Sequence, residues 1–155
     1  MRLADVLTVD GISTDLTARD KDATLRELAR LVAAGEGGSP TLDAEAVYQA
    51  LAEREQLATT GVGSGVAIPH GRLHTDRFRV AIAISPDGVP FDSVDGEPAR
   101  ILFAVLAPES HPADQLRVLA RISRVLKDQA VRSRLLGAAS RQAALDIVVE
   151  EELRH

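Results

Sequence analysis

The chain has 155 residues, of which 45% are hydrophobic, and this is enough apolar side chain for one domain with a sizeable core. Aromatic residues make up 3% of the chain, so the core must be built from aliphatic side chains, unlike a base-stacking nucleic-acid surface. The formal net charge of −5 argues against a general binder of nucleic acid or of anionic membranes, and the lack of cysteine excludes disulfides and thiol catalysis. No apolar run is long enough to span a membrane and the N-terminus lacks a signal-peptide core, so we expect a soluble, cytoplasmic protein.

The beginning of the chain predicts a short amphipathic turn over residues 3–7 and a brief strand over 12–16. A helix is predicted over about 21–34, because Asp20 is a good N-cap and apolar residues then recur at helical spacing. The apolar face of this helix consists of Leu25, Leu28, Leu31 and Val32.

Residues 35–40 are rich in glycine and contain a proline, which predicts a firm break after this helix. A second helix is expected from near Asp43 to Arg54, with Val47, Leu51 and Ala50 directed inward. Arg54 would then lie at the C-terminal end of this helix, where a cation complements the helix dipole.

Two strongly apolar runs, 80–84 and 101–107, have the length and β-branching of strands that are buried on both faces. Between them, 85–88 and 92–96 are predicted to be turns, and 89–91 a short edge segment.

A long helix is predicted to open at Pro112 and to end near Lys127, since proline is favourable in the first helical turn. Its expected apolar face is Leu116, Leu119, Ile122 and Leu126, with Val118 and Val125 beside it. A short helix over 130–136 and a last helix capped by Ser140 complete the chain. Strands that alternate with helices predict an α/β fold.

The most informative segment is 54–71, which reads REQLATTGVGSGVAIPHG. Pro69 fixes its own φ and disfavours the α region at Ile68, so His70 is expected on a rigid, non-helical corner. Neutral histidine has a nitrogen lone pair near pH 7 and can form a covalent intermediate, and glycine-rich turns can form an anion-binding concavity. The candidate phosphate-binding loop is made up of Thr60, Gly61, Gly63 and Gly65.

Simpler interpretations exist for each of these features. A histidine in a loop is often only a solvated side chain, and three alternating glycines can be an ordinary turn. Thr60 can donate to a phosphate or stabilise the turn, and we favour the turn. A zinc site at His70 and His74 would need a helix, which Pro69 and Gly71 oppose, so no metal is expected. The glycine spacing also does not match a dinucleotide-binding loop, and no cofactor is expected.

Taken whole, the segment resembles the active-site signature of type-2 IIA domains of the bacterial phosphoenolpyruvate-dependent phosphotransferase system, the fructose/mannitol-like class. Within this class it is most similar to the nitrogen-regulatory IIA subgroup. The matching residues are Arg-Glu at 54–55, Thr-Gly-x-Gly at 60–63 and Ala-Ile-Pro-His-Gly at 67–71, and the similarity runs from about Leu3 to Leu145. The resemblance implies one domain over 1–155, with a core of about 3–150, built on a mixed sheet flanked by helices on both faces.

The resemblance also assigns roles to particular residues. It implies that His70 is the phosphohistidine and that Arg54 stabilises the phosphoryl group. The family usually has a second active-site histidine in a His-Leu-x-x-Leu pattern, and the corresponding stretch here begins with Gln115. A glutamine amide can donate to a phosphate oxygen but cannot titrate. His111, one helical turn earlier, is either a substitute for that histidine or a solvent-exposed residue at the helix start.

The implied phosphoryl donor is an HPr- or NPr-type phosphocarrier protein. Two onward routes stay open. A transport component would pass the phosphoryl group to a sugar-specific IIB domain, whereas a regulator would bind targets such as kinases or potassium transporters according to its phosphorylation state.

Overall fold

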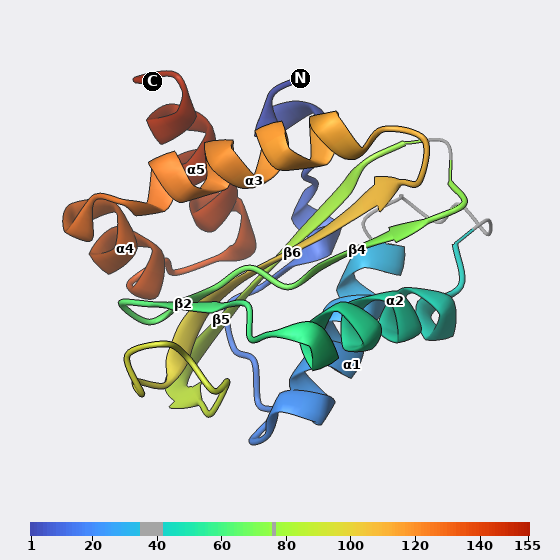
Figure 1. The fold of residues 1–155 in the computed structure, drawn as a ribbon. Helices are drawn as coiled ribbons and strands as arrows, with labels where there is room; N and C mark the ends of the chain where they lie inside the picture. The colour runs from blue at the N-terminus through green and yellow to red at the C-terminus, as the bar shows by residue number, and fades with distance from the viewer. Residues whose placement is uncertain (35–41, 76) are drawn as a thin grey trace.

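A six-stranded mixed β-sheet forms the centre of the molecule, with helices packed on both of its faces (Figure 1). The computed structural model describes residues 1–34, 42–75 and 77–155. The helix break predicted over 35–40 lies outside the described residues. The architecture confirms the α/β fold with a mixed sheet and helices on both sides.

The two long strands β5 and β6 run antiparallel through the middle of the sheet. The strands are β1 (Ile12–Ser13), β2 (Gly61–Gly63), β3 (Val66–Ala67), β4 (His70–Leu73), β5 (Arg79–Val89) and β6 (Ala99–Pro108). Their order is β1-β5-β6-β3-β2, with β4 also paired to β6. β3 pairs with the beginning of β6 and β4 pairs in parallel with its end, where His70 lies opposite Val105. Among the described strands β4 has no other partner, so it is an edge strand.

The helices lie in two layers, one on each face of the sheet (Figure 1). They are α1 (Lys21–Ala34), α2 (Ala44–Leu57), α3 (Pro112–Leu126), α4 (Gln129–Leu136) and α5 (Arg141–Glu152), with two short 3₁₀ turns at Leu3–Asp5 and Val9–Gly11. α1 and α2 cover one face, and α3, α4 and α5 cover the other. None of the helices in the described parts of the chain is long and apolar enough to cross a membrane.

Side chains of the central strands alternate between the two layers, because successive residues of a strand point to opposite faces. In β5, Val80, Ile82 and Ile84 pack into the core beneath α3, α4 and α5, whereas the small residues Ala81 and Ala83 pack beneath α1 and α2. This two-sided burial explains why the strands read as continuous apolar runs, and it confirms their prediction.

Most helix limits also agree with the sequence. The side chain of Asp20 accepts a hydrogen bond from the backbone N–H of Ala23 at 2.7 Å, and that of Ser140 accepts one from Ala143 at 3.0 Å. The second helix extends further than predicted, to Leu57, so Arg54 lies in its last turn rather than at its end.

The turn predicted over 85–88 is wrong, because these residues continue strand β5. The pairing register with β6 shifts between Ile84 and Val89, so the proline and glycine produce an irregularity in the strand and not a reversal of the chain. The reversal occurs in the segment 92–96, where Asp92 and Gly96 have positive φ. The 89–91 segment begins as the end of β5, with Val89 paired to Ala99.

The predicted apolar face of α3 is wrong at Leu116, whose side chain is 68% exposed. The buried face is turned toward Gln115, Val118, Ile122 and Val125. Gln115 takes a core-facing position that the hydrophobic pattern assigned to its neighbour, and this places an amide at the edge of the sheet, where it contacts β4.

Candidate active site

His70 is the first residue of β4, directly after Pro69, at the free edge of the sheet. The carbonyl of Pro69 accepts a hydrogen bond of 2.9 Å from the backbone N–H of Val105, which fixes this corner to β6. Proline can accept but not donate in such a ladder, so its position at the strand entry is compatible with the sheet. The backbone at His70 is therefore non-helical, as expected.

Gly71 lets helix α2 lie against β4. A Cβ atom at this position would lie 3.0 Å from backbone atoms of Ala50 in α2, closer than ordinary van der Waals contact. The absent side chain therefore allows the close approach of this helix, which carries Arg54, to the strand that carries His70.

The imidazole of His70 is held by one hydrogen bond, with Nδ1 at 2.8 Å from the carbonyl oxygen of Ile68. A carbonyl oxygen only accepts, so Nδ1 carries the proton and Nε2 keeps its lone pair. Burial has the largest effect on the pKa of His70 and lowers it below its usual value of 6.5. The hydrogen bond to the Ile68 carbonyl, next in size, raises this pKa, as does Glu55, whereas the charges of Arg54 and Arg72 lower it. The lowered pKa favours the neutral ring at pH 7, and Nε2 has no hydrogen-bond partner among the described residues.

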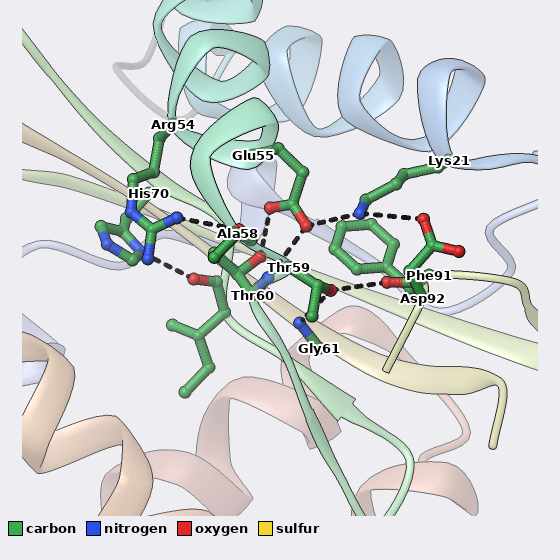
Figure 2. A network of polar contacts seen from close by, with 11 residues as sticks. Lys21, Arg54, Glu55, Ala58, Thr59, Thr60, Gly61, His70, Phe91 and Asp92 are labelled. Atoms are coloured by element: carbon green, nitrogen blue, oxygen red, sulfur yellow. Dashed lines mark hydrogen bonds and ion pairs between the residues drawn. The ribbon is translucent and has the colours of Figure 1, made fainter. Parts of the chain in front are cut away.

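His70 lines an open depression of about 540 Å³ at this edge of the sheet. The depression is lined by α2, β4 and α3 through Ala50, Glu53, Arg54, Leu57, His70, Gly71, Arg72 and Gln115. Arg54 is held there by a hydrogen bond of 2.9 Å from Nη1 to the carbonyl of Ala58, and Figure 2 shows its guanidinium group beside the His70 ring. An open site with a fixed cation suits a reaction in which a second protein brings a phosphoryl group.

Glu55 is a residue for which sequence reasoning found no role, although it follows Arg54 in the motif. Its buried carboxylate accepts from the backbone N–H of Thr60 at 2.9 Å and from the Thr60 hydroxyl at 2.6 Å, and Lys21 lies 2.7 Å from Oε1 (Figure 2). The carbonyl of Thr60 in turn accepts from the backbone N–H of Ile68 at 3.0 Å. Thr60 therefore joins the glycine-rich segment to α2.

The three glycines of the candidate phosphate-binding loop lie in the β2–β3 hairpin. Gly63 and Gly65 have φ values of 98° and 76°, which the tight turn around Ser64 requires. The Ser64 backbone N–H already donates to Asp95 at 2.9 Å. None of the three lines the depression that holds His70 in the described structure, so the fold does not bring them together with the imidazole.

The two candidates for the second active-site position are placed differently. Gln115 is buried and lines the depression, where it contacts β4. His111 occupies the N-cap position of α3 without a capping hydrogen bond from its side chain, and it is exposed. Its Nδ1 lies 2.7 Å from the Ser110 hydroxyl, and it is not among the described residues that line the depression.

Sequence reasoning also missed Arg72, which lines the depression and donates from Nε to Gln115 Oε1 at 2.9 Å. The available signal was its spacing, because residues two apart in a strand share a face. His74 is exposed beyond the end of β4, and no group of three potential metal ligands occurs in the described part of the chain.

Comparison with known proteins adds independent information. The model of the family described as phosphoenolpyruvate-dependent sugar phosphotransferase system, EIIA 2, matches residues 5–151. A nitrogen regulatory protein of Bradyrhizobium diazoefficiens is 36% identical over 96% of this chain and 95% of its own length. A fructose-specific EIIA component of the same system, from Haloferax volcanii, is 42% identical over 70% of this chain and 71% of its own. The crystal structure of nitrogen regulatory protein IIA-Ntr from Neisseria meningitidis is similar with a TM-score of 0.86 and 28% identity, covering 94% of this chain and 98% of that one.

Proposed function

The chain belongs to the EIIA type-2 family of the phosphoenolpyruvate-dependent phosphotransferase system, and on this basis we propose that it is a phosphocarrier whose acceptor atom is Nε2 of His70. The phosphoryl donor is an HPr- or NPr-type phosphohistidine protein. The observation that carries the proposal is the hydrogen bond from Nδ1 to the Ile68 carbonyl, which leaves the Nε2 lone pair available on a residue that lines the open depression.

In the transfer step, the Nε2 lone pair attacks the phosphorus of the donor's phosphohistidine. The new N–P bond forms as the donor's P–N bond breaks, and the bonding electron pair returns to the donor's ring nitrogen. Nδ1 keeps its proton throughout, and the Ile68 carbonyl stabilises the positive charge that the His70 ring acquires. Arg54 supports the step because its guanidinium is permanently charged and suits the negative oxygens of the transferring group.

We assign the protein to a regulatory role of the nitrogen type, acting in the cytoplasm as a single EIIA domain. The support is that the nitrogen regulatory relative covers nearly the whole chain. In this role the phosphorylation state of His70 changes the shape and charge of the depression, and hence affinity for targets such as kinases or potassium transporters.

Transfer to a fructose/mannitol-type IIB domain is the second candidate function, favoured by the fructose-specific relative. The two functions differ in whether the phosphoryl group leaves the chain rapidly. Phosphorylated protein mixed with such a IIB domain should keep its label in the regulatory case and lose it within seconds to minutes in the transport case.

The proposal is tested by incubating the protein with phosphoenolpyruvate, enzyme I and an HPr-type protein, and mapping the acid-labile modification by mass spectrometry. We expect one phosphoryl group on His70, none in His70→Ala, and unchanged labelling in His74→Ala, an exposed histidine of the same region. Labelling that persists in His70→Ala would overturn the proposal.

A further inference from the structure

We infer that Arg72 is a second phosphate-binding guanidinium of this site, and that Gln115 is a positioning residue which holds Arg72 for that role. The inference rests on the proposed function of His70. It concerns two residues on different elements, β4 and α3, that meet in the same depression.

The first support is the geometry of β4. His70 and Arg72 are two residues apart in this strand, so their side chains emerge on the same face. Gly71 between them faces α2, where a Cβ atom would meet Ala50. β4 is an edge strand among those described, and the two side chains line the same depression at this edge of the sheet.

The second support is the pair of hydrogen bonds between Gln115 and strand β4. Its side chain is buried, with Oε1 accepting from Nε of Arg72 at 2.9 Å and Nε2 donating to the carbonyl of Gly71 at 3.0 Å. The orientation of the amide is determined, because an arginine can only donate and a carbonyl can only accept. Gln115 thus contacts two consecutive residues of β4 and fixes the inner edge of the guanidinium.

The third support is what remains free on Arg72. Within the described residues, its terminal nitrogens Nη1 and Nη2 make no hydrogen bond or ion pair, since only Nε is engaged. The outer edge of the guanidinium therefore offers donors in the fork geometry that matches two oxygens of a phosphoryl group.

The charges around the depression favour an anion. Arg54 faces it from α2 and Arg72 from β4, and among the described lining residues the only carboxylate is that of Glu53. Glu55, the nearby buried acid, is already engaged by Lys21 and Thr60. Although the chain carries a net charge of −5, this site is locally positive. The charge of Arg72 also contributes to the lowered pKa of His70, which agrees with its closeness to the ring.

The test uses two readouts that do not depend on a protein donor. The first is chemical phosphorylation of His70 by potassium phosphoramidate, in which the Nε2–P bond forms as the reagent's P–N bond breaks and ammonia leaves. The second is the pKa of His70 in the unphosphorylated protein, followed by NMR. Transfer from an HPr-type protein is measured beside them.

We expect Arg72→Ala to slow both phosphorylation reactions by about tenfold to a hundredfold, at or below the range for one lost oxyanion donor, and to raise the pKa of His70. Arg72→Lys should recover part of the rate, because the charge returns without the fork. Arg117→Ala is the matched control, an exposed arginine of α3 that pairs with Asp114 outside this depression, and it should change neither readout.

Gln115→Leu, which keeps the side-chain size, tests the positioning role in two backgrounds. It should slow phosphorylation when Arg72 is present and have little further effect in Arg72→Ala, since the two residues act as one unit. A full Gln115→Leu effect in the absence of Arg72 would overturn the positioning role. An unchanged rate and an unchanged His70 pKa in Arg72→Ala would overturn the role of Arg72.

The design separates this inference from the proposed function. If an HPr-type protein fails to label the wild type, the proposed donor is wrong. The phosphoramidate and pKa readouts still decide whether Arg72 binds an anionic group at His70.

Discussion

The carboxylate of Glu55 accepts two hydrogen bonds from Thr60, one from the backbone N–H at 2.9 Å and one from the hydroxyl at 2.6 Å. Glu55 belongs to the last turns of α2, and Thr60 precedes the hairpin that leads to His70 (Figure 2). Since Thr60 also accepts from Ile68, whose own carbonyl holds the imidazole, a continuous set of contacts joins α2 to His70.

Glu55→Gln should therefore lower the free energy of unfolding by about 1–3 kcal/mol, the usual cost of leaving buried polar groups unsatisfied. The amide nitrogen cannot accept from Thr60, and Lys21 loses the negative charge of its buried partner. Chemical denaturation measures the change. Glu53→Gln, an exposed neighbour on the same helix, serves as the control and should unfold like the wild type. Equal stability of both variants would show that the Glu55 contacts are energetically unimportant.

Arg54→Ala should slow phosphoryl transfer by about one to three orders of magnitude, the range for lost charge-stabilising groups. Its effect on the free energy of unfolding should stay at about 1 kcal/mol or less, because the residue only complements a helix end and donates a hydrogen bond to the Ala58 carbonyl. Quenched assays measure the rate of phosphoryl transfer, and chemical denaturation measures the free energy of unfolding. Arg30→Ala, which changes an exposed arginine of α1, is the control. Equal transfer rates in the wild type, Arg54→Ala and Arg30→Ala would show that Arg54 only complements the helix end.

Gly71→Ala should impair both stability and transfer, because the added Cβ would lie 3.0 Å from the α2 backbone at Ala50. We expect the free energy of unfolding to fall by about 1–3 kcal/mol, the cost typical of overpacking, as α2 and Arg54 move away from His70. The matched control is Gly137→Ala, whose Cβ would meet nothing closer than 3.6 Å. Identical behaviour of the two variants would contradict the role of Gly71 in bringing α2 to the strand.

The pH dependence of phosphoryl acceptance should show one inflection, below the usual imidazole value of 6.5 because burial lowers the pKa of His70. Neutral histidine is the nucleophile, so acceptance is full above this pKa and is lost as the pH falls through it. His111→Ala should leave the profile unchanged, since His111 does not line the depression. Gln115→His should add a second inflection, because two interacting imidazoles titrate as a pair. Loss of an inflection in His111→Ala would show that His111 takes part.

The local backbone of the motif was predictable from the sequence, because Pro69 fixes its own φ and restricts Ile68 wherever such a pair occurs. The positions of Asp20 and Ser140 as helix caps were also predictable, because their side-chain oxygens accept from free N–H groups of the first helical turn. By contrast, the grouping of Gln115 with Arg72 depends on where α3 meets the edge of the sheet, which no local pattern encodes.

The glycine-rich segment shows the same limit. Its composition predicted a turn and indicated an anion site, but pairing with β3 directs Gly61 and Gly63 into a hairpin away from the His70 depression. Leu116 was placed in the core because an apolar residue at helical spacing is usually buried, whereas contacts with β4 turn the neighbouring Gln115 inward instead.

The most direct test of the account is the position of the phosphoryl group on the imidazole, read by nitrogen-15 and phosphorus-31 NMR after phosphorylation by an HPr-type donor. The bond from Nδ1 to the Ile68 carbonyl predicts that phosphorus is attached to Nε2 of His70, with the Nδ1 proton retained. Attachment at Nδ1, or on a residue other than His70, would contradict the account.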